Sequence, residues 1–265
     1  MITNLKYHIA GFSFVKSKHV SAHGNNKMIE LPCLVAEFTH PVYGRFFIDT
    51  GMESLYDFRF VYPFNIYTKI APFQINKKFI DVNHKASGLL LTHAHPDHIG
   101  GIHKFFYQDS PKIWEHPVIG LNIPSVSAKT SLSRMFFHGL GCLTQDITKL
   151  PKVSISNLSS FKEGIDIFMD SSVLAISLPG HDKNQIGYYF PNTDSGAVFM
   201  VADAVWNTEE MKAGLYPSSL VALLTGNPLI YKKTYSNLIK LSQERKDITF
   251  ISSHDMKLLQ IGDTV

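Results

Sequence analysis

The stretch LLLTHAHPDHIGG, residues 89–101, constrains the fold of this chain more than any other. Its leucines predict a short strand that is buried on both faces. Four ionisable side chains follow that strand within six residues: His93, His95, Asp97 and His98. Such groups repel one another when charged and are costly to bury without partners. Bound metal ions would explain the cluster, because imidazole nitrogens and carboxylate oxygens are preferred ligands of zinc and similar divalent ions.

The spacing within the cluster favours two ions over one. Alternate side chains of an extended segment point to the same side, so His93 and His95 are expected to face a common ion. Pro96 then turns the chain, and Asp97 and His98 can face a second ion nearby. Four ligands this close in sequence could surround a single small ion only with a strained backbone. We therefore expect a site for two ions, which needs further ligands from elsewhere.

Three such residues stand where apolar strands end. His181 follows the strand of ISLPGH, Asp203 ends AVFMVAD, and His254 ends ITFISSH. A layered fold gathers its functional site at strand ends of this kind, so these residues are expected to complete the ligand set. Each has an ordinary alternative when taken alone. A lone buried histidine is usually structural, and Asp203 could cap a helix that begins near Thr208.

The composition is that of a globular protein. The chain has 265 residues, of which 45% are hydrophobic and 18% charged, so a large core needs no disulfides. The two cysteines, Cys33 and Cys142, suit a reducing compartment. The N-terminal stretch lacks the features of a signal peptide, and no segment reaches the roughly 20 apolar residues of a membrane span. A cytoplasmic location is expected, and the net charge of +3, carried by scattered lysines, does not favour a nucleic-acid partner.

The order of elements indicates a single domain, residues 1–265, in which sheets pack together with helices outside. Strands are expected over residues 7–15, 31–38, 45–50, 88–92, 112–116, 164–169, 173–179, 186–191, 197–203 and 248–254. Helices are expected over residues 98–108, 131–140, 208–215 and 231–246.

Residues 52–80 interrupt this plan with many aromatic side chains and no clear periodicity. They could form a loop or lid with an apolar inner face, or simply pack onto the core. As a lid the segment would line an apolar substrate channel. Its candidate pocket residues are Phe58, Phe64 and Tyr67.

The motif THAHPDHIGG resembles the H-x-H-x-D-H signature of the metallo-β-lactamase-fold hydrolases, and His181, Asp203 and His254 follow in the order typical of that superfamily. The resemblance implies an α/β fold, the αβ/βα four-layer sandwich, with a dinuclear site along one edge. It also implies a distribution of ligands. His93, His95 and His181 would bind one ion, Asp97, His98 and His254 the other, and Asp203 would bridge the two.

Within the superfamily the chain looks most like the N-acyl-homoserine lactone lactonases. The likeness lies in IELPCLVAEF, IDTGM, PGH, FMVADAVWNTEEM and FISSHD. Two positions depart from that pattern. Trp206 stands where those lactonases usually have a tyrosine that helps to hold the substrate carbonyl, and Gln185 stands where they often have a second histidine. These departures leave the ligands intact and bear on the substrate.

The expected reaction is hydrolysis of a lactone or related ester, with N-acyl-homoserine lactone as one candidate substrate. Two divalent ions can share a hydroxide that attacks the carbonyl. Asp97 is the candidate to pass a proton to the leaving alkoxide, and Trp206 either donates its N–H to the oxyanion or packs against the pocket wall. Asp49 is expected to support a ligand histidine or to cap its own turn.

Several alternatives stay open at this point. A thioesterase of the glyoxalase II type would share all seven ligands, a phosphodiesterase is a further possibility, and a metal-binding accessory protein would keep the site without catalysis. Zinc is the first candidate metal, with iron, manganese or cobalt as others. The sequence leaves both a monomer and a homodimer open.

Overall fold

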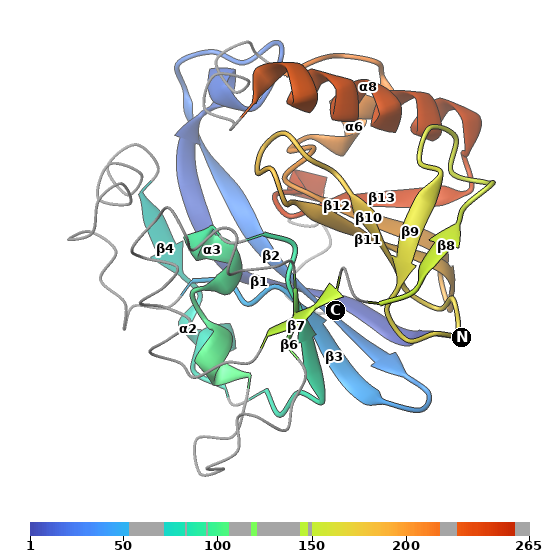
Figure 1. The fold of residues 1–265 in the computed structure, drawn as a ribbon. Helices are drawn as coiled ribbons and strands as arrows, with labels where there is room; N and C mark the ends of the chain where they lie inside the picture. The colour runs from blue at the N-terminus through green and yellow to red at the C-terminus, as the bar shows by residue number, and fades with distance from the viewer. Residues whose placement is uncertain are drawn as a thin grey trace.

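The structure is a computed structural model, and it describes residues 1–52, 72–82, 84–93, 95–105, 118–120, 144–147, 150–217 and 227–257. Two sheets lie face to face, and helices cover their outer faces (Figure 1). None of the helices in the described part combines the length and the apolar character that a membrane crossing requires.

Seven strands of the described residues form the first sheet, in the order β4-β1-β2-β3-β5-β6-β7. Their bounds are β1 Thr3–Lys16, β2 Met28–His40, β3 Gly44–Ile48, β4 Phe73–Ile75, β5 Gly88–Leu90, β6 Val118–Gly120 and β7 Thr144–Asp146. The long β1–β2 pair and the β2–β3 pair are antiparallel. From β3 through β5 and β6 to β7 the strands are parallel, so their carboxyl ends reach the same edge of the sheet.

The second sheet has the order β13-β12-β11-β10-β9-β8 among the described residues. Its strands are β8 Lys152–Ser154, β9 Glu163–Asp166, β10 Leu174–Ser177, β11 Ile186–Thr193, β12 Gly196–Ala202 and β13 Ile248–Ser252. Strand β11 is antiparallel to both β10 and β12, whereas β12 and β13 are parallel. Consequently β10, β12 and β13 all run in one direction, and their carboxyl ends lie at a common edge.

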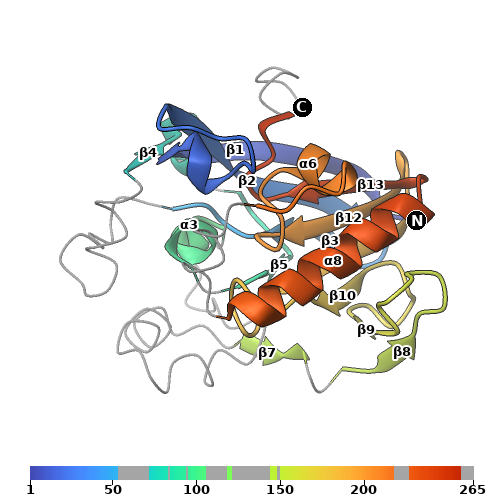
Figure 2. The same ribbon diagram turned by 90° about the horizontal axis from the view of Figure 1, so that it is seen from above.

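The described helices are short except for one. They are α2 Lys77–Ile80, α3 Pro96–Ile99, α6 Thr208–Lys212 and α8 Pro228–Glu244, with 3-10 turns η1 Ser17–His19 and η3 Ile102–Lys104. Helix α8 begins where Asn227 accepts hydrogen bonds from the N–H groups of Leu229 and Ile230, and Pro228 fills its first turn. It lies across the second sheet, beside α6 (Figure 2).

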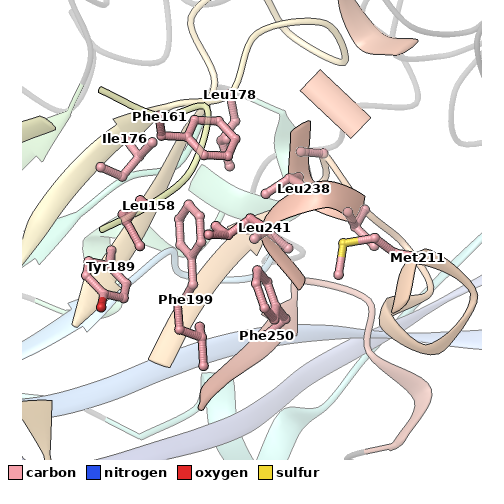
Figure 3. Close-up of a cluster of buried hydrophobic side chains, with 14 of the residues drawn as sticks. Leu158, Phe161, Ile176, Leu178, Tyr189, Phe199, Met211, Leu238, Leu241 and Phe250 are labelled. Carbon is pink, nitrogen blue, oxygen red and sulfur yellow. The ribbon is translucent and has the colours of Figure 1, made fainter. Parts of the chain in front are cut away.

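Three apolar clusters define four layers. The first, which includes Phe199 and Leu238, joins the second sheet to α8 (Figure 3). The second lies between the two sheets and includes Phe38 and Tyr188. The third joins the outer face of the first sheet to α2 and η3, with Phe47 at its centre. This arrangement confirms the predicted αβ/βα four-layer sandwich.

Most predicted strands are confirmed, but the helix expected over residues 98–108 is wrong. The chain instead forms one α-helical turn, α3, followed by the separate 3-10 turn η3. Gly100 and Gly101 separate the two turns, because the backbone passes very close to a neighbouring segment here. A Cβ atom on Gly101 would lie 2.6 Å from the carbonyl oxygen of Thr50, and the N–H of Gly101 donates to the carbonyl of Gly51 at 2.9 Å.

The end of the aromatic stretch at residues 52–80 belongs to the packed fold. Strand β4 pairs with β1, and Phe79 of α2 is buried in the third cluster. The three candidate pocket residues, Phe58, Phe64 and Tyr67, lie outside the described residues, as do the strand expected over 112–116 and the helix expected over 131–140.

Candidate metal centre

The proposed ligands come from strands whose carboxyl ends meet at one edge. His93 follows β5, His181 follows β10, Asp203 follows β12, and His254 follows β13. Strand β11 runs the opposite way, so its first residue lies at this same edge. There the N–H of Ile186 donates to the carbonyl of Thr92 at 2.9 Å, which joins the second sheet to the segment after β5. Parallel strand direction therefore explains why residues so far apart in sequence gather at one place.

Three imidazoles form the first group. The Nδ1 atom of His95 lies 3.0 Å from Nε2 of His93 and 2.9 Å from Nε2 of His181. The three rings meet edge to face, with centroids between 4.5 and 5.0 Å apart. One nitrogen of each ring thus points to a common point, as the ligands of a single ion do.

Asp97, His98 and His254 form the second group. Oδ2 of Asp97 lies 3.8 Å from Nε2 of His98 and 3.7 Å from Nε2 of His254. All three side chains are buried. Helix α3 places Asp97 and His98, because Pro96 in its first turn bends the chain away from the direction of His95.

Asp203 lies between the two groups. Its Oδ2 atom is 3.4 Å from Nε2 of His181 in the first group and 3.3 Å from Nε2 of His254 in the second. Its Oδ1 atom is 3.5 Å from Nε2 of His98. It does not cap the following helix, because Asn207 accepts the hydrogen bonds at the start of α6.

The two groups differ in their electrostatics. Burial lowers the pKa of His181 to about 3 and also lowers the pKa values of His93 and His95, so these imidazoles are neutral and have lone pairs to offer. Burial also opposes the charged form of His98 and His254. The nearby carboxylates, Asp203 first among them, outweigh it and raise the pKa values of both histidines.

The donor atoms fit divalent metal ions. Apart from Nδ1 of His181, whose other nitrogen faces the centre, three buried side-chain atoms in these groups have no hydrogen-bond partner among the described residues: Asp97 Oδ1, His98 Nε2 and Asp203 Oδ1. An unpaired buried polar atom is costly, and native proteins rarely keep several together. Three triads each have their ligand atoms within 4.8 Å of one another: His93 with His95 and His181, His93 with His98 and Asp203, and Asp97 with His254 and Cys33.

Contacts outside the two groups fix the orientation of the rings. Nδ1 of His98 donates to Oδ2 of Asp49 at 2.8 Å, and Nδ1 of His254 donates to the carbonyl of Pro32 at 2.8 Å. Each contact uses Nδ1, so Nε2 is the nitrogen that faces the centre and can bind an ion once its proton is displaced. Asp49 also accepts from the N–H and the hydroxyl of Thr92, both at 2.8 Å.

A family model described as the metallo-beta-lactamase superfamily matches residues 85–254. The chain belongs to the metallo-beta-lactamase superfamily. It is thus a metal-dependent hydrolase with a fold that binds divalent metal, and its structure holds clusters of histidine and aspartate side chains that could bind an ion. No curated protein matches the chain significantly by sequence.

Solved structures with low sequence identity share this fold. One is a Bacillus thuringiensis AiiA variant with N-decanoyl-L-homoserine at its active site, with 15% identity, a TM-score of 0.67, and coverage of 99% of this chain and 97% of that one. Another is an N-acyl homoserine lactone hydrolase with N-hexanoyl-L-homoserine at its catalytic metal centre, at 16% identity, TM-score 0.67 and coverage of 99% and 97%. A third is AidC, a dizinc quorum-quenching lactonase, at 14% identity, TM-score 0.58 and coverage of 97% and 89%.

The two residues expected to depart from the lactonase pattern, Trp206 and Gln185, lie near the centre or deep in the core. The ring of Trp206 packs edge-on against His181 at 6.0 Å and against His254 at 5.9 Å between centroids. Its Nε1 atom and both amide atoms of Gln185 are buried without hydrogen-bond partners in the described part of the chain. Trp206 therefore touches residues of both groups.

Sequence reasoning missed Thr92 and Cys33. The Thr92 hydroxyl lies within hydrogen-bonding distance of Asp49 and of His93 Nδ1, and its place next to the histidine motif could have pointed to it. Cys33, taken only as part of a strand, has its Sγ atom 3.8 Å from Oδ2 of Asp97. Nothing in the local pattern of β2 distinguishes this cysteine from an ordinary core residue.

Proposed function

We propose that this superfamily member is a dinuclear hydrolase that opens a lactone or a related ester, with N-acyl-homoserine lactone as the first candidate substrate. The observation that carries the proposal is the position of Asp203. One carboxylate oxygen is 3.4 Å from His181 of the first group and 3.3 Å from His254 of the second, which suits a ligand shared by two ions.

Each of the two ions would have its own set of ligands. His93, His95 and His181 would hold one ion, and Asp97, His98 and His254 would hold the other, with Asp203 bridging. Imidazole and carboxylate ligands favour zinc and also accept iron, manganese or cobalt. When bound, such cations supply Lewis acidity and a water acidified enough to act as a nucleophile near neutral pH.

Asp97 is suited to move a proton during the reaction. Its Oδ2 atom faces His98 and His254, whereas its Oδ1 atom has no hydrogen-bond partner among the described residues. A carboxylate with one free oxygen beside the reacting centre can take a proton and deliver it to the alkoxide that leaves when a lactone ring opens.

Asp49 and Pro32 hold two of the ligand rings in place, and Trp206 forms part of the wall beside both groups. The lactone substrate is supported by structural neighbours that bind acyl-homoserine products.

The test combines metal content with turnover of lactones, esters, thioesters and phosphodiesters. We expect two ions per chain and hydrolysis of lactones in preference to the others. Asp203→Asn should lose at least one ion and about 100-fold of the activity. Asp194→Asn, an exposed carboxylate in the turn between β11 and β12, is the matched control and should keep both. Two bound ions with turnover only of thioesters or phosphodiesters would overturn the substrate, and failure to bind two ions would overturn the dinuclear site.

A further inference from the structure

Cys33 lies next to Asp97 and His254 of the second ligand group. It lies on β2, is 2% exposed, and places its Sγ atom 3.8 Å from Oδ2 of Asp97. Its Sγ atom, one oxygen of Asp97 and one nitrogen of His254 all lie within 4.8 Å of one another. We infer that Cys33 is an additional ligand of the second ion, an inference that rests on the proposed function.

The separations suit a metal ion better than a thiol hydrogen bond. Zinc binds sulfur at about 2.3 Å and nitrogen or oxygen at about 2.0–2.2 Å, so donor atoms in a tetrahedron around it lie roughly 3.4–3.6 Å apart. Oδ2 of Asp97 is 3.8 Å from Sγ of Cys33 and 3.7 Å from Nε2 of His254. A shift of a few tenths of an ångström toward a common centre would give all three their bonding distances.

A second observation points to the same place. Nε2 of His98, on a side chain only 2% exposed, lies 3.8 Å from Oδ2 of Asp97 and has no hydrogen-bond partner in the described residues. The other Asp97 oxygen, Oδ1, is also buried and unpartnered there. Both atoms belong to residues of the second group, where buried atoms without partners form an incomplete set that an ion would complete.

Strand β2 holds this set in place. Pro32, the residue before Cys33, accepts the Nδ1–H of His254 through its carbonyl at 2.8 Å. The N–H of Leu34, the residue after, donates to the carbonyl of Ser253 at 2.9 Å. The residues on either side of Cys33 thus bind the chain that follows β13 and hold the backbone of Cys33 beside the second group.

Burial and the nearby Asp97 raise the pKa of the Cys33 thiol, so the sulfur keeps its proton until an ion displaces it. The hydroxyl of Ser13, on the neighbouring strand β1, lies 3.7 Å from Sγ and can donate to it. On binding, the S–H proton passes to solvent and the sulfur–metal bond takes its place. Thiolate is a softer ligand than imidazole or carboxylate, so Cys33 should favour zinc or cobalt over manganese at the second position.

Cobalt substitution tests the inference directly, because a thiolate bound to Co²⁺ gives a near-ultraviolet charge-transfer band that nitrogen and oxygen ligands do not give. We expect this band in the wild-type chain loaded with two Co²⁺ ions and in Cys142→Ser, the matched control. It should be absent in Cys33→Ser, whose affinity for the second zinc ion should fall about tenfold or more. The affinity for manganese should change less.

The outcomes separate the two proposals. Two bound Co²⁺ ions without the band, or with a band that Cys142→Ser abolishes, would overturn the role of Cys33 and leave the dinuclear site standing. Failure to bind two ions would overturn both. If Cys33→Ser does not fold, alkylation of the Cys142→Ser chain decides, since bound metal should protect Cys33 from the reagent and an equal rate with and without metal would refute ligation.

Discussion

Asp49 has a backbone φ of 61°, a conformation that residues other than glycine seldom adopt. Such strain persists when surrounding contacts require it, and Asp49 contacts both Thr92 and the proposed ligand His98. Asp49→Asn removes the charge that holds the His98 ring. We expect metal affinity to fall about 10–100-fold, measured by competition with a chelator.

The control for this variant is Asp170→Asn. Asp170 also pairs with a histidine, His40, at 2.9 Å, but lies outside the proposed ligand groups. It should leave metal affinity unchanged. An Asp49→Asn protein with wild-type affinity would show that His98 is held in place without this carboxylate.

Trp206 is a second position where one side chain can be tested. Its ring packs against His181 and His254, and its N–H is the group it could offer to an oxyanion. If the ions take most of the developing charge, Trp206→Phe keeps the packing and lowers kcat by less than about tenfold, or about 1.4 kcal/mol. Steady-state kinetics on the preferred substrate gives the answer, and a larger loss would assign oxyanion stabilisation to the indole N–H.

At this scale the sequence indicated which residues gather, because several proposed ligands are polar groups close to the end of an apolar strand. His93, Asp203 and His254 all follow that rule. Cys33 could not be predicted in this way, because it lies within β2 and cysteine is common in buried strands. Its place at the centre depends on how β2 packs against α3 and the end of β13, which is tertiary information.

Helix α8 shows how one element supports the second sheet. Leu238 is completely buried against that sheet, whereas Leu229 on the same helix is 82% exposed. Leu238→Ala should lower the free energy of unfolding by about 2–5 kcal/mol, through lost burial and the cavity left behind. Leu229→Ala should change it by less than about 0.5 kcal/mol. Urea denaturation measures both, and similar values for the two would contradict this packing.

Elements with strong periodicity were predictable from sequence and short ones were not. The apolar spacing of residues 231–246 predicted the helix that α8 confirms, and the strands β1, β2 and β12 were expected near their observed positions. The break after α3 could not be predicted from sequence. Gly100 and Gly101 are required there because a distant segment, residues 50–52, packs too closely for a Cβ atom.

The stability of the whole molecule should depend on the protonation of His84. Burial lowers the pKa of this histidine to about 4; its Nε2 donates to the carbonyl of Phe79, and its ring stacks on Phe105. The unfolded chain takes up the proton near pH 6.5, before the folded one does. His84 therefore stabilises the fold above pH 6.5, and this contribution is lost as the pH falls toward 4.

We expect the free energy of unfolding to fall between pH 7 and pH 5, and His84→Gln to reduce that fall by about 1 kcal/mol. Denaturant titrations of the metal-loaded protein at the two pH values measure the difference. His23→Gln, which changes an exposed histidine, serves as the control and should leave the pH dependence as it is. An unaltered pH dependence in His84→Gln would assign the effect to other groups.

The proposed ligands come from both sheets, and His254 comes only after β13, the last strand described. A nascent chain that has emerged from the ribosome as far as His98 carries most of the first group but cannot yet enclose an ion between the sheets. Under the proposed assignment, cofactor loading can therefore be completed only once translation has passed His254.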